Sequence, residues 1–150
     1  MAKVTWNDAS TEERILRVEK LVETLESMPL HDQRKHFDMS SWMESKHCGT
    51  VGCAAGHCAL NPWFKRRGFG FDIKSGDFTH FEPNDFFGEE IYSSIFVNPK
   101  FTDMPAGREA YKAVLAAARA TLASMKADAA EDAASDAAQT AREEVYDLTN

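Results

Sequence analysis

Residues 10–28 read STEERILRVEKLVETLESM and predict the first long helix of the chain. The Ser10 side chain can cap this helix by accepting from the Glu13 backbone amide, while the Glu13 side chain reaches back to the amide of Ser10. Apolar residues then recur at steps of three and four, as on one face of a helix, until Pro29: Ile15, Val18, Leu21, Val22, Leu25 and Met28. Because a single helix of this length is marginally stable in water, its apolar face needs a partner.

A second long helix is predicted toward the C-terminus. Pro105 suits its first turn, because the amide that proline lacks would have no helical acceptor there. The apolar stripe of this helix consists of Tyr111, Val114, Leu115, Ala118, Leu122 and Met125.

Residues 126–150 differ from the rest of the chain in composition. They contain seven acidic and two basic residues, so they carry −5 of the total charge of −7. Their many alanines favour helix but bury little surface, since one methyl group contributes only about 0.8 kcal/mol. We expect a helical extension that projects from the body or frays, either as a solvated helix or as a partner-binding surface. Its candidate anchors are Val145, Tyr146 and Leu148.

Shorter elements are predicted between the two long helices. Residues 30–46 form a connector anchored in the core by scattered apolar side chains. In residues 69–81, phenylalanines alternate with other residues around a glycine turn, which predicts a small β-hairpin. A further helix is expected from Pro83 until Asn98 and Pro99 break it.

Residues 47–60 read HCGTVGCAAGHCAL and combine glycine, cysteine and histidine in one short segment. We predict a tight turn at Gly49, an N-cap at Thr50 and a helix that stops before Pro62. Glycine weakens a helix interior by about 1 kcal/mol relative to alanine, so glycines inside this helix need a structural use.

Gly52 and Gly56 would share one face of that helix, because they are one turn apart. Without side chains they allow another backbone or an aromatic ring to approach closely. Trp42 or Trp63 can supply such a ring. Small side chains in this segment would therefore let a compact helical body close tightly.

The overall composition places the chain among ordinary globular proteins. It has 150 residues, which suits one domain, and its formal charge of −7 argues against a general electrostatic grip on nucleic acid. No apolar run approaches the roughly 18 residues that span a membrane, and the N-terminus lacks the apolar stretch of a signal peptide. Three cysteines are an odd number that suits a reducing compartment, so we expect a cytoplasmic protein.

The cysteines and histidines provide enough donors for a zinc site. Cys53 and His57 are four residues apart, on one face of the predicted helix, and Cys48 lies just before it. Cys58 or His47 can complete the set. The spacing differs from that of zinc knuckles, because there is no C-x-x-C pair and all candidates lie in one segment.

Two other interpretations of these cysteines remain open. Free cysteine is among the most buried side chains, so Cys48, Cys53 and Cys58 can act as small apolar residues packed against aromatic neighbours. Alternatively, Cys48 or Cys53 is a reactive nucleophile with a histidine as base. No orienting acid or oxyanion donor can be assigned to that arrangement.

A basic and aromatic segment offers a candidate partner surface. Trp63 is followed by Lys65, Arg66 and Arg67, a mixture found in grooves that bind single-stranded nucleic acid. Three positive charges form only a small patch on an acidic protein, and aromatic residues more often belong to a core, so nucleic-acid binding is the weaker interpretation. Trp63, Arg66 and Arg67 are candidate residues for contact with a protein partner.

Residues 37–42 (FDMSSW) and 48–57 (CGTVGCAAGH) resemble a pattern met in small uncharacterised proteins of bacteriophages and bacteria. Those proteins pair an F-D-M-x-x-W-like segment with a C-G-T-x-x-C-x-A-G motif. The likeness covers roughly residues 10–120 and omits the alanine-rich tail. It implies a compact, mostly helical, intracellular and phage-encoded protein, and it implies no particular reaction.

Together these patterns predict a mostly α protein with a small β-hairpin (α+β), with a globular body over residues 1–125 and an acidic helical or frayed tail over residues 126–150. We expect a non-enzymatic protein-binding factor, phage-encoded and acting on a host or virion protein in the host cytoplasm. One alternative is a zinc-stabilised domain or small metallohydrolase that uses Cys48, Cys53 and His57. Another is an acidic mimic of nucleic acid, because a row of carboxylates can imitate phosphates.

Overall fold

The computed structural model describes residues 3–41, 43–46 and 49–149. Its elements in chain order are α1 (Thr11–Glu26), α2 (Leu30–Lys35), β1 (Met43–Lys46), β2 (Gly49–Gly52), α3 (Ala54–Ala59), α4 (Pro62–Arg66), β3 (Phe71–Asp72), β4 (Asp77–Phe78), α5 (Pro83–Ile91), the π-helical turn η1 (Tyr92–Phe96), α6 (Pro99–Thr102) and α7 (Arg108–Thr149). The strands form two antiparallel hairpins, β1–β2 and β3–β4. The prediction of a mostly α protein with a small hairpin and a C-terminal helical extension is confirmed.

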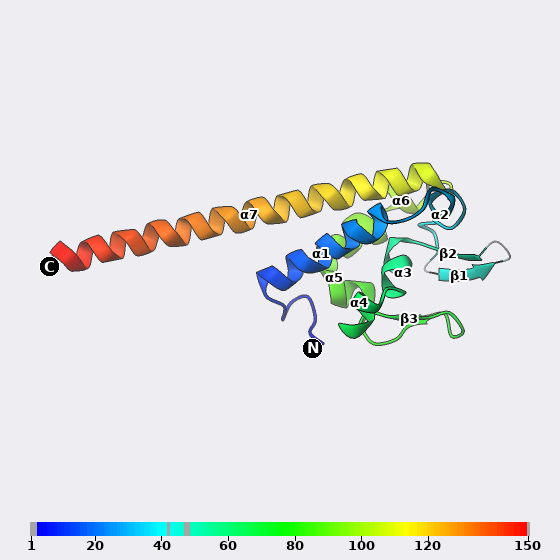
Figure 1. Ribbon diagram of the computed structural model, residues 1–150, viewed down its shortest axis with the longest axis horizontal. Coiled ribbons are helices and arrows are strands. Elements are labelled where there is room, and N and C mark those ends of the chain that lie inside the picture. Colours follow the sequence, from blue (N-terminus) through cyan, green and yellow to red (C-terminus); the bar gives the residue numbers. More distant parts are fainter. Residues whose placement is uncertain (1–2, 42, 47–48, 150) are drawn as a thin grey trace.

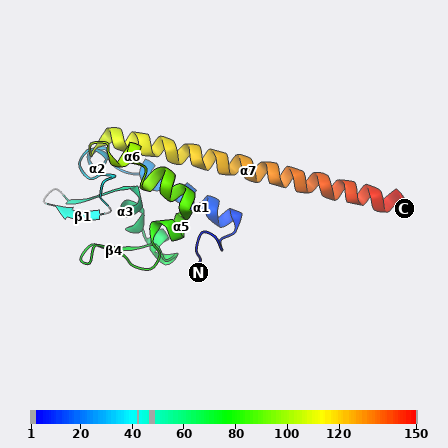
Figure 2. The same ribbon diagram turned by 180° about the vertical axis from the view of Figure 1, so that it is seen from behind.

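The two long helices predicted from the sequence pack against each other. α1 lies beside the first half of α7, and α7 then continues past the body to the C-terminus (Figures 1 and 2). Ser10 caps α1 as expected, with its Oγ accepting from the Glu13 amide at 3.1 Å. The Glu13 carboxylate does not complete the capping box; it pairs with Arg67 at 3.1 Å. The Tyr111 hydroxyl joins the helices by donating to the Leu25 carbonyl at 2.5 Å.

A cluster of phenylalanines fills the body beneath α1. Phe64, Phe69, Phe86 and Phe87 are fully buried, and their ring centroids lie 5.0 to 6.1 Å apart. Edge and offset contacts of this kind each add about 0.5–1.5 kcal/mol beyond the area that the rings bury. α4, the loop before β3, and α5 are thereby held around one aromatic core.

The prediction of one helix across residues 50–61 is wrong. Gly49 and Thr50 lie in β2, whose last residue, Gly52, pairs with Met43. Gly52 also accepts from the Asp38 amide and donates to the His36 carbonyl, each at 3.0 Å. Sheet pairing thus uses the backbone groups that a helix would have needed.

α3 instead begins after Cys53, whose Sγ accepts from the Gly56 amide at 3.4 Å. Of the two glycines, Gly56 alone lies in the helix, where it is buried. Trp42, one of the aromatic partners expected for these glycines, lies outside the described residues.

Replacing Gly56 by leucine is expected to destabilise the fold by about 1 to 3 kcal/mol, because a large side chain would overpack a buried site. Thermal melts followed by circular dichroism measure the change. Ala127→Leu, at an exposed position of α7, is the control and should stay within about 0.5 kcal/mol. A neutral effect of Gly56→Leu would contradict a close contact at this glycine.

The later helices also differ in detail from the expectation. The helix predicted from Pro83 is present, but Gly88 interrupts α5 with φ +84° and the chain continues as the π-helical turn η1. α7 begins at Arg108, three residues after Pro105, because Gly107 adopts φ +128° and donates to the Phe37 carbonyl at 2.9 Å. No described helix is long and apolar enough to cross a membrane.

The extension of α7 is helical to Thr149, and residues 130–148 are exposed. Acidic residues recur along one side of it at steps of four and seven: Asp128, Asp132, Asp136, Glu143 and Asp147. Alanines recur along the opposite side at steps of three and four: Ala127, Ala130, Ala134, Ala137 and Ala141. The acidic side continues the stripe of α7 that packs on the body, since Val114, Ala118 and Met125 precede it at the same spacing.

Candidate functional site

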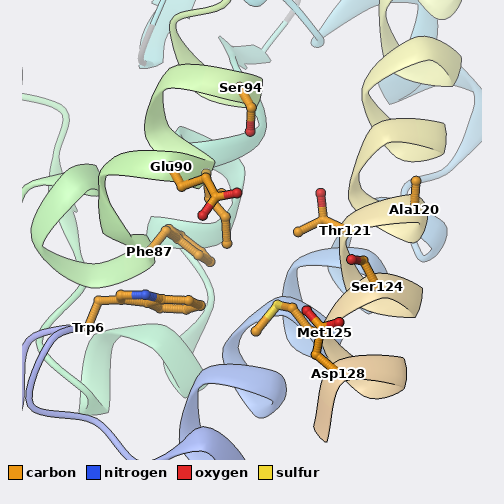
Figure 3. Close-up of a pocket in the computed structure, with 10 residues that line it drawn as sticks. Trp6, Phe87, Glu90, Ser94, Ala120, Thr121, Ser124, Met125 and Asp128 are labelled. Atoms are coloured by element: carbon orange, nitrogen blue, oxygen red, sulfur yellow. The ribbon is translucent and has the colours of Figure 1, made fainter. Parts of the chain in front are cut away.

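A cavity of about 390 Å³ lies between α5, η1 and the middle of α7 (Figure 3). Trp6 and Phe87 form an aromatic wall, and side chains of α7 face them across the gap. Three hydroxyl groups line the same space: Ser94, Thr121 and Ser124. The cavity therefore has an aromatic patch formed by Trp6 and Phe87 and hydrogen-bonding groups on both sides, since Ser94 lies on the side of Phe87 and Thr121 and Ser124 lie on α7.

The N-terminal segment brings Trp6 to the cavity, and two arginines of α1 hold that segment. Arg14 donates through Nε to the Trp6 carbonyl at 2.7 Å, and Arg17 donates through Nη2 to the Val4 carbonyl at 2.8 Å. The Trp6 amide donates to the Asp85 carbonyl of α5 at 2.7 Å. Trp6 is thus attached to two different helices through its backbone, and the Arg14 guanidinium carbon also lies 5.2 Å from the centre of its ring.

Gly88 makes room for the indole ring. A Cβ atom built on this residue would lie 2.6 Å from Cδ1 of Trp6, which is far inside van der Waals contact. The backbone of Gly88 also has φ +84° and ψ 157°, a region that is nearly restricted to glycine. The interruption of α5 is therefore what lets Trp6 lie against the helix.

Two carboxylates enter the cavity from opposite walls. Glu90 comes from α5 and Asp128 from α7, and both point toward the gap (Figure 3). Neither has an ion pair with any residue that the structure describes. The cavity thus combines an aromatic wall with two carboxylates that no described cation neutralises.

The cysteine and histidine segment has a different environment. Cys53 and Cys58 are fully buried, and burial raises the pKa of the Cys53 thiol to about 12 and that of Cys58 as well. His57 stacks on Phe37, its Nε2 lies 2.7 Å from the His36 carbonyl, and burial lowers its pKa. Thiols held in the protonated form are poor nucleophiles and poor metal ligands.

The described residues contain no group of three His, Cys, Asp or Glu side chains arranged to hold a metal ion. Cys48, a member of the predicted zinc set, and His47, one of the two residues that could complete it, lie outside the described residues. The zinc site stays a prediction that depends on Cys48. Metal analysis of protein purified without chelator tests it directly.

Burial of the thiols predicts that the protein loses stability in alkali. The unfolded chain has the ordinary thiol pKa near 9, whereas that of folded Cys53 is about 12. When the pH lies between these two pKa values, unfolding releases a proton from the thiol. The free energy of unfolding therefore falls as the pH rises, by up to about 1.4 kcal/mol per pH unit for each thiol. Urea unfolding at about pH 8 and about pH 10 measures the slope. Cys53→Ala should show a smaller slope than the parent protein, and an equal slope would contradict the assignment.

The predicted partner-binding residues fall into two groups. Arg67 is buried, with its guanidinium carbon 3.6 Å above the centre of the half-buried Trp63 ring, so it is unavailable as a surface anchor. Arg66 is exposed. The anchors of the extension have exposed fractions of 60% for Val145, 67% for Tyr146 and 87% for Leu148.

The cavity itself was missed by the sequence patterns. Its lining comes from three distant stretches, near residues 6, 87–94 and 120–128. The sequence offered two signals: Trp6, which lies outside any predicted helix, and Gly88, which lies within one. Neither signal indicates which residues would be its neighbours in the fold.

Comparison with known proteins adds no relative: no family model, no curated protein and no solved structure matches the chain. The protein is therefore described by its own fold and cavity. It is a small helical body with a cavity that two carboxylates help to line, and with one long helix that projects beyond the body (Figure 1).

Proposed function

We propose that this protein is a non-enzymatic binding factor that engages a basic surface of a protein partner through the acidic side of the α7 extension. The observation that supports this most is the segregation of charge on an exposed helix. Five carboxylates share one side of the extension, and residues 126–150 hold only two basic residues. A phage origin and a host or virion partner belong to this proposal.

The charges on that side disfavour the free helix. Carboxylates four residues apart on a helix repel each other, which destabilises an isolated helix by about 0.2–0.5 kcal/mol per pair. Asp128, Asp132 and Asp136 form two such pairs in succession. A cationic partner would remove this repulsion, and the acidic field would also speed its approach at low salt.

A second candidate function is mimicry of nucleic acid by the same row of carboxylates. Here the partner is a DNA-binding protein, and DNA competes for it. The two functions share one surface, so adding DNA to the pull-down separates them: DNA should displace the captured partner if the carboxylates mimic nucleic acid, and an undisturbed complex would reject the mimic.

The experiment is a quantitative pull-down from the native host, with partners identified by crosslinking. Asp136→Asn/Glu143→Gln removes two charges from the acidic side, and Glu131→Gln/Glu144→Gln removes two charges from elsewhere on the extension. We expect the first variant to capture about tenfold less partner and the second to capture normal amounts, since a tenfold loss corresponds to about 1.4 kcal/mol. Equal capture by both variants, or by a chain ending at residue 125, would contradict the proposal.

A further inference from the structure

We propose that the cavity between α5, η1 and α7 binds the guanidinium group of an arginine side chain presented by the protein partner. The cavity is the feature on which this inference depends. The statement that the arginine belongs to a protein partner rests on the proposed function. The affinity of the cavity for a guanidinium group can be tested independently.

The aromatic wall suits a planar cation. Trp6 is attached through its own carbonyl and amide and lies against Gly88, so its ring is positioned before any ligand arrives. Phe87 continues the wall. Guanidinium groups stack on aromatic faces, with tryptophan the best partner, and they are less strongly hydrated than ammonium groups.

The polar side chains that line the cavity can accept hydrogen bonds. Glu90 and Asp128 approach from two walls, and neither carboxylate is paired with a cation in the described part of the chain. The hydroxyl oxygens of Ser94, Thr121 and Ser124 add further acceptors. A guanidinium carries five N–H donors in a fixed plane and an ammonium carries three, so acceptors on two walls favour arginine over lysine.

The size and place of the cavity fit a side chain that belongs to a longer peptide. Its volume of about 390 Å³ is near the lower end of the range for small-ligand sites, about 300–1,000 Å³. Asp128 lines the cavity and begins the acidic side of the extension, where Asp132 is one turn further along. A basic peptide anchored in the cavity can therefore continue along the carboxylates of α7.

The test uses the full chain and two-dimensional NMR, with N-acetylarginine methylamide as the probe. Its lysine and citrulline counterparts serve as controls, since citrulline has nearly the shape of arginine without the charge. We expect the Trp6 indole signal, assigned by its loss in Trp6→Phe, to shift with the arginine probe at about 10 mM. The lysine probe should bind at least about fivefold more weakly, and the citrulline probe should cause no shift.

Variants locate the binding site. Glu90→Gln/Asp128→Asn should weaken the arginine probe at least about tenfold, whereas Glu131→Gln/Glu144→Gln should leave its affinity unchanged. The proposal is overturned if Trp6 does not respond, if citrulline binds as well as arginine, or if the two variants behave alike. Binding of the probe together with a failed pull-down would keep the cavity as a guanidinium site and reject only the protein source. A pull-down that depends on the extension, without a Trp6 response, would keep the proposed function and reject this site.

Discussion

Replacing Arg17 by methionine is expected to lower the free energy of unfolding by about 3 kcal/mol. Its side chain is only 1% exposed and donates to the carbonyls of Phe86 at 2.9 Å and Val4 at 2.8 Å. Its guanidinium also lies 4.1 Å from the centre of the Phe86 ring. Methionine fills much of the volume but leaves a buried carbonyl without a donor. Urea unfolding followed by circular dichroism measures the loss.

The control for this substitution is Arg119→Met. Arg119 has a 56% exposed side chain and lies 3.5 Å from Glu26 in a surface ion pair. Such pairs contribute at most about 1 kcal/mol, so the control should change stability by less than that. If Arg17→Met were no more harmful than Arg119→Met, the buried arginine would not be what attaches the N-terminal segment.

Replacing Gly88 by alanine is expected to destabilise the protein by about 3 kcal/mol, for two separate reasons. The backbone conformation at φ +84° and ψ 157° is strained for any residue with a side chain. In addition, the new Cβ would lie 2.6 Å from Cδ1 of Trp6, so the indole ring would have to move away from the cavity. Thermal and urea unfolding measure the combined effect.

Gly76 is the matched control, because it also has a positive φ, +76°, but a Cβ there meets no atom within 4 Å. Gly76→Ala should be destabilising by about 1 kcal/mol, through the backbone alone. Combining Trp6→Ala with Gly88→Ala should remove the steric clash. The double variant should therefore lose less unfolding free energy than the sum of the losses of the two single variants. Strict additivity would mean that the ring and the glycine do not meet.

Helix caps and apolar spacing correctly predicted the two long helices, α1 and α7, because each buries a regularly repeated face. Ser10 marks the start of α1, and the apolar spacing of α1 and α7 places Val18, Leu21 and Val114 in the core. Residues 50–61 could not be predicted in this way, because glycine and alanine are compatible with several conformations. The pairing of Gly52 with distant Met43, and its bonds to His36 and Asp38, decided between strand and helix there.

The candidate site was predictable only in part. The acidic character of Asp128 and its neighbours is visible in the composition of the tail. That Trp6 would form a wall of the same cavity depends on the two arginines of α1 and on the backbone of Gly88. No periodicity records contacts of that kind, since each joins single residues far apart in the chain.

By itself, the amino-acid sequence determined that two amphipathic helices exist and that an acidic, alanine-rich segment with a preference for helix follows the second, because helix caps, helical periodicity and helix propensity are properties of neighbouring residues. Tertiary structure alone decided that β2 replaces the start of a helix, that Arg17 is buried, and that Trp6, Glu90 and Asp128 surround one cavity. The physical reason is that burial and hydrogen-bond satisfaction depend on which distant groups meet, and these contacts override the weak local preferences of glycine-rich or isolated residues.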